Sequence, residues 1–448
     1  MDIRNSTDLN QLVKEKNFKT LKHELAKLRE ADIASFMDDL STENVVIVFR
    51  SLPKDMGAQV FSYLSSDMQE HIVKSITDQE IASIINELFI DDAADLLEEL
   101  PASVVKRVLK NASPEARTLI NQFLQYPPDS AGSIMTAEFV DLKKTMTVRQ
   151  AFDRIRKTAL DKETVYTCYV IDANRRLEGV ISVKRLFLAD DDTVLSDIME
   201  TNIISATTTD DQEWVAQLFA KYDLLSLPVV DHENRLVGIV TVDDVVEVIR
   251  QEATEDFQKM AAMAPSEKPY LKTGVFSLAK NRILWLMVLM ISAMLTGGVL
   301  TKYEQAFVAL PVLVTFIPML TDTGGNAGSQ SSTLVIRGMA LSEITTRDFF
   351  PVLWKEFRVS LIVGAALSAV NFLRLVLMYP GEYLMALTVS LALYATVVMA
   401  KTIGGVLPLI AKFFNTDPAI MASPVITTIV DACSLIIYFK IVEVMLMP

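Results

Sequence analysis

Oxygen-bearing side chains that could bind a hard cation gather at two places in this sequence. The first is a polar run within an otherwise apolar stretch, residues 318–332 (PMLTDTGGNAGSQSS), which contains Asp322 and Asn326. The second is an acidic run, residues 91–99 (DDAADLLEE), in which Asp91 and Asp95 share one face of a helix. Carboxylate and amide oxygens suit hard divalent cations. Because polar segments are tolerated in a bilayer only where they are buried in protein or line a water-filled cavity, the first run predicts a pore or a transport site.

The acidic run has a second interpretation, which is a solvated helix face with favourable acids at the helix start. Charged side chains inside an apolar span are more informative, because a bilayer disfavours them and they therefore mark function. Asp322 and Asp431 are two such acids. Asp322 could instead cap a helix at a break, whereas Asp431 has no break beside it and needs a partner. In a symmetric dimer, Asp431 would face its own copy across the axis.

Three basic residues, Arg374, Lys401 and Lys440, also lie in or near apolar segments. We expect their long side chains to reach the membrane surface, where the charged group stays in water. These residues are therefore not predicted to take part in a cation site.

Composition divides the chain into an acidic part and a membrane part. Of 448 residues, 51% are hydrophobic; residues 1–270 contain 47 acids and 30 bases, and residues 271–448 contain 9 acids and 12 bases. The acidic balance argues against a nucleic-acid partner, since phosphates select basic surfaces, and it suits a domain that collects cations. The first residues have no apolar core of a signal peptide, so we expect the acidic part to be cytoplasmic.

Cysteine and histidine usage excludes other kinds of site. Cys168 and Cys433 are far apart, which implies neither a disulfide framework nor a thiolate metal site. The histidines are scattered at positions 23, 71 and 232, so a zinc site is not expected. No nucleophile and base are paired in the apolar segments, and we expect the protein not to be an enzyme.

The first region, residues 1–129, contains a repeat of twelve residues. An aliphatic residue recurs at this spacing, and each recurrence is followed by a helix breaker or cap, as Pro53 follows Leu52. The recurring residues are Leu40, Leu52, Leu64, Ile76, Leu88 and Leu100. This pattern predicts one short helix per repeat, stacked into an all-α helical-repeat domain.

The second region, residues 130–245, contains two copies of a strand-rich module. Residues 166–183 parallel residues 226–242, and each copy predicts a strand, a turn, a second strand and a helix. The two copies resemble tandem CBS domains, an α/β fold whose cleft commonly takes an adenine nucleotide. In that family a Ser/Thr-x-x-Asp motif holds the ribose. Thr241 and Asp244 match it in the second copy, which implies ATP binding there, whereas the first copy has Ser182 and then Arg185 in place of the acid.

A connecting helix and linker are predicted at residues 246–270, with helical spacing from about Val242 to Met263. An apolar stripe runs through it, and acids lie on another side, which predicts a mechanical link that a cation could bridge. The stripe is Val245, Ile249, Ala253, Phe257 and Met260, and the acids are Glu252, Glu255 and Asp256.

Residues 271–448 predict an α-helical transmembrane domain with five spans, so that the whole chain is a multidomain protein of the cell membrane. The spans are expected near residues 283–303, 306–336, 354–379, 383–411 and 417–446. Most basic loop residues fall on one side, and the positive-inside rule therefore places the N-terminal and CBS regions in the cytoplasm and the C-terminus outside.

Three motifs together resemble the MgtE family of magnesium channels and transporters: residues 318–330, Asp417-Pro418 and residues 427–431 (TTIVD). The resemblance covers essentially the whole chain. It implies a homodimer whose pore lies between the second and fifth spans, with the connecting helix as a plug. It further implies that Asp431 selects Mg²⁺ and that Asp417 lies at the cytoplasmic mouth. The other pore residues implied are Asn326, Gly324, Gly325, Gly328, Thr427 and Asp322.

The resemblance also implies regulation by cytosolic Mg²⁺ bound between the N domain, the CBS domains and the connecting helix. The matching acids are Asp91, Asp95, Asp211, Glu213, Asp223, Asp244, Glu247, Glu252, Glu255 and Asp256. High cytosolic Mg²⁺ would bridge these acids and close the pore. The alternatives are a carrier coupled to a proton or sodium gradient, an intramembrane enzyme with a regulatory CBS pair, and a sensor that binds ions without conducting them.

Overall fold

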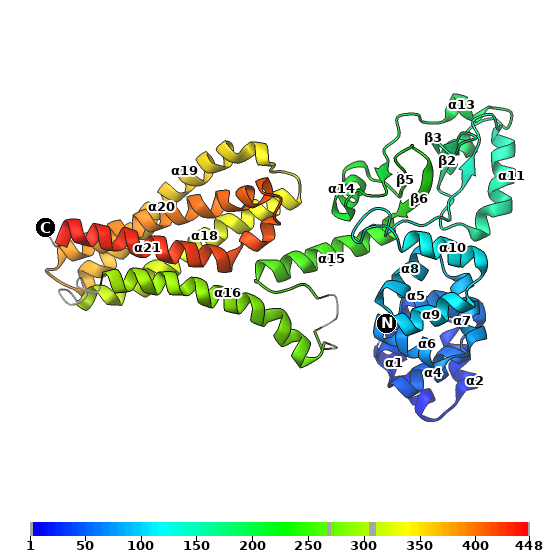
Figure 1. Cartoon of the computed structure of the whole chain (residues 1–448), viewed down its shortest axis with the longest axis horizontal. Helices are drawn as coiled ribbons and strands as arrows, with labels where there is room; N and C mark the ends of the chain where they lie inside the picture. The colour runs from blue at the N-terminus through cyan, green and yellow to red at the C-terminus, as the bar shows by residue number, and fades with distance from the viewer. Residues whose placement is uncertain (1–2, 267–269, 272, 304–310, 447–448) are drawn as a thin grey trace. The chain divides into compact units, whose positions relative to one another are not determined.

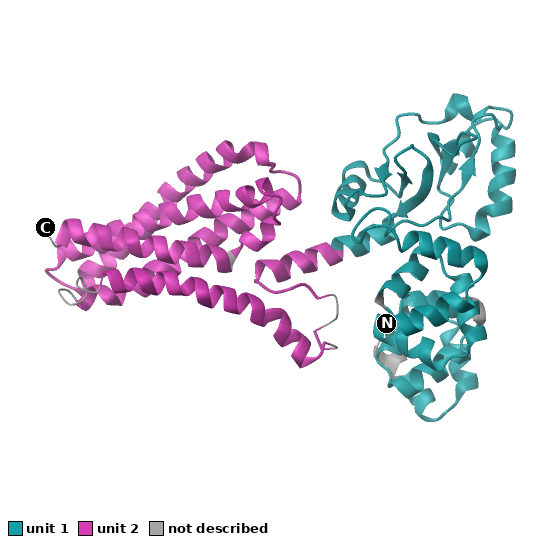
Figure 2. Ribbon diagram, viewed as in Figure 1, with its two compact units in different colours: residues 1–249 teal, residues 250–448 magenta. Residues whose placement is uncertain are grey.

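The structure of the protein is a computed structural model that describes residues 3–266, 270–271, 273–303 and 311–446 (Figure 1). The chain divides into two compact units, Met1–Ile249 and Arg250–Pro448 (Figure 2). The first unit contains the helical repeat and the two strand-rich modules, and the second contains the long apolar helices.

Short helices at a spacing of twelve residues build the first half of the first unit. After α1 (Ile3–Lys14) and α2 (Phe18–Leu25) come α3 (Glu30–Asp38), α4 (Thr42–Ser51), α5 (Lys54–Ser62), α6 (Ser66–Ser75), α7 (Asp78–Glu87), α8 (Ile90–Glu99), α9 (Ala102–Asn111) and α10 (Pro114–Phe123). From α3 onward each helix begins twelve residues after the one before it. The predicted helix in every repeat is therefore confirmed.

Burial of the recurring aliphatic residue explains why helices this short are stable. Leu52 and Ile76, for example, are 7% and 4% exposed. Each helix also packs against the helix two positions along the chain, as α3 does against α5 and α7 against α9. A ten-residue helix is marginal on its own, whereas burying one such side chain contributes about 1.5–3 kcal/mol.

The two strand-rich modules each form a three-stranded sheet with the same topology. The first has the order β1-β2-β3 and the second β4-β5-β6; the outer pair in each is parallel and the hairpin antiparallel. Their elements are β1 (Asp141–Leu142), α11 (Val148–Thr158), η1 (Ala159–Asp161), β2 (Thr167–Ile171), β3 (Leu177–Ser182), α12 (Val183–Leu188), α13 (Leu195–Ile198), β4 (Ala206–Thr207), α14 (Gln212–Tyr222), β5 (Ser226–Val230) and β6 (Leu236–Thr241).

The hairpins of the two modules pair with each other. Leu177 N donates to Asn234 O and Leu236 N donates to Arg175 O, so that the contact is reciprocal. The hydroxyl of Tyr169 in β2 lies 2.7 Å from that of Ser226 in β5, and both side chains are buried. The predicted duplication therefore forms a single paired structure.

The helix α15 (Val242–Met260) follows β6 directly and ends three residues before the predicted Met263. Two residues after the end of the helix, Ala262 has a positive φ of 52°, which is not a helical conformation. Val245 and Val248 are buried, but Ile249 and Phe257 are 48% and 73% exposed. The predicted apolar stripe is therefore correct only for the first turns, where the helix packs on the modules.

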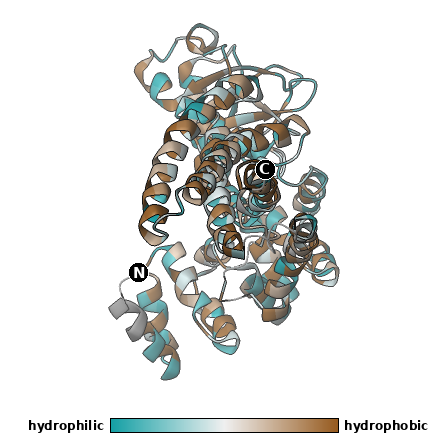
Figure 3. Cartoon of the chain, turned by 90° about the vertical axis from the view of Figure 1, so that its left-hand side faces the viewer, coloured by the Kyte–Doolittle hydropathy of each residue, from teal (hydrophilic) through white to brown (hydrophobic). Residues whose placement is uncertain are grey.

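The second unit is a bundle of long helices, coloured brown over much of their length in Figure 3. It contains α16 (Val275–Lys302), η2 (Pro311–Phe316), α18 (Ile317–Ala340), η3 (Thr346–Asp348), α19 (Phe349–Met378), α20 (Tyr383–Phe413), η4 (Pro418–Met421) and α21 (Ser423–Leu446). The central helix α20 packs against α18, α19 and α21. These contacts bury much of α20, although Leu387 and Leu391 on it are 48% and 44% exposed.

Within the described residues, four helical segments are long and apolar enough to cross a membrane, those that contain α16, α19, α20 and α21. The 24-residue helix α18 lies among them but is more polar. The second predicted span also differs in its start: a 3-10 helix covers Pro311–Phe316, and α18 begins only at Ile317. The beginning of that prediction, residues 306–310, lies outside the described residues.

Candidate functional site

One face of α18 is polar and exposed in the single chain. Asp322, Asn326 and Gln330 follow one another at intervals of four residues, and Thr333 and Arg337 continue the same face. These five residues are the polar face of α18. A helix in an apolar bundle cannot present such a face to lipid, because carboxylate and amide groups there would lose their hydrogen bonds to water. The face therefore requires water or another protein surface.

The polar run is a continuous helix, not a break. Asp322 lies inside α18, so the alternative that it caps a helix break is wrong. The glycines lie on the other side of this helix and are buried. A Cβ on Gly404 of α20 would meet the carbonyl oxygen of Gly328 at 2.2 Å, and one on Gly325 would meet Cγ2 of Thr427 at 2.8 Å. Small residues thus let α18 approach α20 and α21 closely.

Asp431 lies on α21, next to this face, and is half-buried. The like charge of Asp322 acts on it electrostatically. One turn earlier on α21, the hydroxyl of Thr427 donates to Pro424 O at 2.9 Å. The structure therefore brings the two membrane acids close together from α18 and α21, although they are far apart in the sequence.

Lys401 differs from its prediction. Arg374 and Lys440 are exposed, as expected for side chains that reach the membrane surface. Lys401, in contrast, is 5% exposed, and its ammonium points at Ala327 O of α18 at 3.5 Å. The prediction was wrong because Lys401 is on the central helix α20, where no side of this position faces lipid.

A second group of acids lies in the first unit, where α8, the start of α15 and the first module meet. Asp91, Asp92 and Asp95 of α8 interact electrostatically with Asp244 and with other acids of the group. The members of this acidic cluster are Asp91, Asp92, Asp95, Glu138, Glu163, Asp243, Asp244 and Glu247. Sequence reasoning selected Asp91, Asp95, Asp244 and Glu247. It missed Asp92, Glu138, Glu163 and Asp243, of which Asp92 alone had a local signal, in the acidic run.

In the described part of the chain, two acids of this cluster each have a buried carboxylate oxygen that lacks a stabilising partner. Oδ1 of Asp91 and Oε2 of Glu163 are buried without a hydrogen-bond partner among the described residues. Burial and the like charges around it raise the pKa of Asp91 well above its usual range. Among the described residues, no three acids converge closely enough to hold a metal directly. A cation that keeps its own waters, as Mg²⁺ does, suits such a site.

Burial first, and then neighbouring carboxylates, raise the other pKa values in the cluster. The pKa of Asp92 and that of Asp244 rise to about 6, and that of Glu163 rises to about 7. Burial and then the charges of neighbouring acids also raise the pKa of Asp95, whose side chain lies at the exposed rim of the cluster. Near neutral pH, the cluster is therefore short of counter-charge and can take up protons or a divalent cation.

The pH dependence of stability follows from these shifts. A raised pKa means that the folded state binds more protons than the unfolded state, so stability falls as pH rises. The loss begins near the unfolded values of 3.8 and 4.5 and is complete above about pH 7. Without divalent cations, we expect the first unit to melt several degrees lower at pH 8 than at pH 5, by calorimetry of the whole protein. We expect Asp92→Asn to reduce the difference and Mg²⁺ to remove it at pH 8. Equal melting at both pH values would contradict the burial of these charges.

The predicted acids Asp211, Glu213 and Asp223 are at the two ends of α14. Asp211 caps the helix and accepts a hydrogen bond from Glu213 N at 2.8 Å. Asp223 ends it in the left-handed region, with φ at 52°. The eleven residues between them span roughly 16 Å at 1.5 Å per residue, so one ion does not bind both ends.

In the second unit, the predicted acids of the connecting helix lie near Asp417, which caps η4 just before α21. Lys259 of α15 forms ion pairs with Glu255 at 2.5 Å and with Asp417 at 2.7 Å. Burial and the charge of Asp417 raise the pKa of Asp256. Glu252 lies one turn earlier on α15. The structure therefore gathers Glu255, Asp256 and Asp417 around one lysine that the sequence reasoning did not select.

The nucleotide motif is formed in the second module. The hydroxyl of Thr241 lies 2.6 Å from a carboxylate oxygen of Asp243 and of Asp244. In the first module, Ser182 caps α12 and accepts a hydrogen bond from Arg185 N at 3.2 Å. Asp244 thus belongs both to the nucleotide motif and to the acidic cluster.

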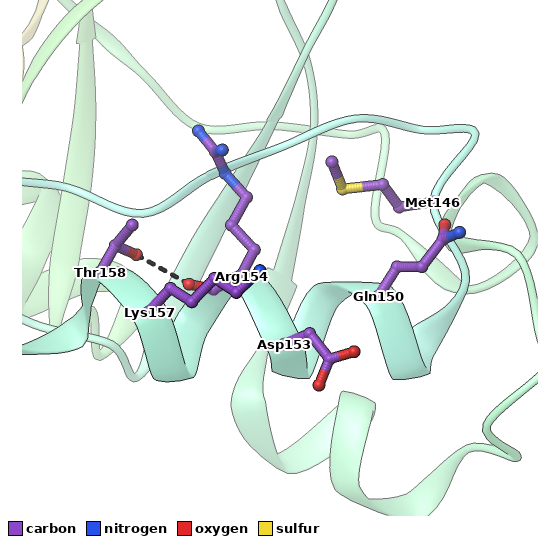
Figure 4. Close-up of a pocket in the computed structure, with 6 residues that line it drawn as sticks. All are labelled: Met146, Gln150, Asp153, Arg154, Lys157 and Thr158. Atoms are coloured by element: carbon purple, nitrogen blue, oxygen red, sulfur yellow. Dashed lines mark hydrogen bonds between the residues drawn. The ribbon is translucent and has the colours of Figure 1, made fainter.

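A shallow hollow beside α11 offers no competing site (Figure 4). Arg154 there is already bound to the backbone and the carboxylate of Asp141, and the hydroxyl of Thr158 donates to Arg154 O. Of the other lining residues, Gln150, Asp153 and Lys157 belong to the same helix, and Met146 precedes it. This hollow has no convergent set of polar groups.

Comparisons with known proteins agree with the domain order. The family model MgtE, described as a divalent cation transporter, matches residues 317–441. The model of the MgtE intracellular N domain matches residues 28–129, and the CBS domain matches residues 131–192 and 195–251. Together these matches cover most of the chain.

Whole-length relatives are magnesium transporters by name. Magnesium transporter MgtE of Thermus thermophilus is 35% identical over all of this chain and 99% of its own length. Magnesium transporter MgtE of Bacillus subtilis is 31% identical over 92% of this chain and 93% of its own. A crystal structure of the cytosolic domain of the Mg²⁺ channel MgtE in complex with ATP covers 54% of this chain and 99% of that one, at 37% identity and a TM-score of 0.52.

Proposed function

The chain belongs to the MgtE family of divalent cation transporters, and we propose that it is a Mg²⁺-selective channel whose pore lies between two copies. The observation that carries this proposal is the polar face of α18 beside Asp431, exposed in a single chain within an apolar bundle. A second copy related by a two-fold axis would cover both faces and enclose water between them. The test is Mg²⁺ entry into liposomes that contain only the purified protein, and its absence would contradict the proposal.

The proposed pore uses five spans in each subunit, with α18 as the second and α21 as the fifth. Two copies of Asp431 then face each other across the axis and bind Mg²⁺ through its water shell. Asp322 and Asn326 supply further oxygens from α18. The buried glycines 324, 325 and 328 support this by bringing α18 close to α20 and α21. In this arrangement the N-terminal and CBS regions are cytosolic, and the C-terminus is outside.

Closure of this channel by cytosolic Mg²⁺ is the regulatory part of the proposal. The acidic cluster joins the helical repeat, the first module and α15, and its charges repel one another until a cation neutralises them. Mg²⁺ bound there favours the conformation in which these elements are together. A cation that prefers one of two states by a few kcal/mol is enough to shift the population of an open and a closed channel.

ATP is the proposed ligand of the CBS pair. The support is the Thr241 and Asp244 motif together with the ATP-bound cytosolic domain of the similar channel. Thr241→Val removes the hydroxyl without changing the size of the side chain. Calorimetry should therefore detect ATP binding to the wild type and not to this variant; equal binding by both would exclude the motif.

A further inference from the structure

The last turns of α15 are attached to the membrane unit at two places. Around Gln258, the chain folds back: Ser266 N donates to Oε1 of Gln258 at 2.6 Å, and Nε2 of Gln258 donates to Ser266 O at 3.1 Å. In the same loop, Ala264 N donates to Asn281 O of α16 at 3.0 Å. The second attachment is the ion pair between Lys259 and Asp417, residues that are 158 positions apart in the sequence.

Lys259 is the only basic group among the partners of these acids that the described residues show. Its ammonium contacts Asp417 Oδ2 and Glu255 Oε1, and Asp256 is near enough for Asp417 to act on it electrostatically. The other oxygen of Asp417 accepts a hydrogen bond from Ala419 N at 2.8 Å and caps η4. The carboxylate of Asp417 thus links Lys259 to the backbone of η4, which leads into α21.

The ion pairs are partly buried, which distinguishes them from an ordinary surface pair. The side chains of Lys259, Asp417 and Glu255 are 24%, 31% and 32% exposed. Burial alone would lower the pKa of Lys259, but its hydrogen bonds to the two carboxylates outweigh burial and raise it. Lys259 therefore remains an ammonium ion at every physiological pH.

Counted over the described residues, the charge at this place is not balanced. Three carboxylates, Glu255, Asp256 and Asp417, surround one ammonium ion, so removal of Lys259 leaves acids that repel one another. A divalent cation could neutralise the same acids, but it would have to displace the ammonium ion. The chain's own cation and a free divalent cation are thus mutually exclusive occupants of one acidic site.

We propose that Lys259 is a positioning residue that fastens the end of α15 to the start of α21 when no divalent cation is bound, and that it competes with the divalent cation for Asp417 and Glu255. This inference rests on the proposed function, in which α15 controls the pore. The ammonium ion of Lys259 would then set the cytosolic Mg²⁺ concentration at which Mg²⁺ binds to Asp417 and Glu255.

Two effects of opposite sign follow for Lys259→Gln. Without divalent cations the fastening is lost, and the amides near the end of α15 become exposed to solvent more often. With divalent cations the fastening returns, and at a lower concentration than in the wild type, because no ammonium ion has to be displaced. A side chain that only filled space would give the first effect without the second.

The experiment is hydrogen exchange of residues 255–262 in the full-length protein in nanodiscs, in EDTA and across a Mg²⁺ titration. For Lys259→Gln we expect exchange about tenfold faster in EDTA and half-protection at about tenfold lower Mg²⁺. Lys259→Arg keeps the charge and should behave as the wild type in EDTA. Lys412→Gln removes an exposed lysine of the same unit and is the matched control.

Exchange in EDTA that is unchanged by Lys259→Gln would overturn the proposal. So would faster exchange that Mg²⁺ does not reverse, since that result indicates a packing role. The measurement does not depend on transport: if the wild type shows this exchange pattern but no Mg²⁺ flux in liposomes, the proposed function fails while the fastening by Lys259 stands.

Discussion

Asp431→Ala is expected to lower Mg²⁺ entry into liposomes by about 100-fold or more. In the proposed dimer, one substitution removes both carboxylates from the narrow part of the pore. A doubly charged ion that keeps its water shell, because Mg²⁺ dehydrates reluctantly, then has to pass this part of the pore without the carboxylates that would bind those waters. Asp431→Asn should be nearly as severe, because it preserves size and removes charge.

The matched control for Asp431 is another carboxylate on the same helix. Glu443 lies three turns further along α21, is exposed and pairs with Lys440 at 2.8 Å. Glu443→Gln should leave Mg²⁺ entry within about twofold of the wild type, as expected for loss of an exposed ion pair. Normal Mg²⁺ entry through Asp431→Ala would be incompatible with a pore that selects by this residue.

Neutralising Asp91, Asp95, Glu252 and Glu255 together is expected to leave the channel conducting at high cytosolic Mg²⁺. The four substitutions remove negative charge from the acidic cluster and from the later turns of α15. Mg²⁺ then binds the closed state less tightly, so it stabilises that state less. We expect the Mg²⁺ concentration that halves the flux to rise at least tenfold, which corresponds to about 1.4 kcal/mol of lost preference. Patch-clamp recording with Mg²⁺ titrated on the cytosolic side measures it.

A second quadruple variant controls for the change in total charge. Glu43, Glu87, Asp190 and Asp192 are exposed acids of the first unit that are not members of the acidic cluster. Their neutralisation alters the net charge by the same amount and should leave the closing concentration unchanged. If the first variant closed like the wild type, or if both variants lost closure equally, gating would not depend on these particular acids.

Local patterns allowed the first unit to be predicted in detail. The repeat of twelve residues predicted one helix per repeat and an aliphatic position that is buried in most repeats, since a helix and its stop are properties of a short segment. The two modules were visible because their strand pairs are copied within one chain. Which residues of the apolar stripe on α15 are buried was not predictable, because the exposure of Ile249 and Phe257 depends on which elements pack against the helix.

Residues that meet across long sequence separations were the ones missed. Glu163 joins the acidic cluster from the segment before β2, and Lys259 meets Asp417 from 158 residues away; neither contact leaves a periodic signal. Lys401 was assigned to the wrong surface because α20 is apolar all round, so its sequence does not reveal which side faces protein. The continuity of α18 through its glycines likewise depends on packing against α20 and α21.

The most direct measurement of the central claim is Mg²⁺ flux through the purified wild-type protein in liposomes, with the proton and sodium gradients collapsed by ionophores. A channel that uses the polar face of α18 and Asp431 moves Mg²⁺ down its own gradient, so flux should continue and should follow the Mg²⁺ gradient alone. Flux that stops when either gradient is collapsed would contradict a channel and identify a coupled carrier.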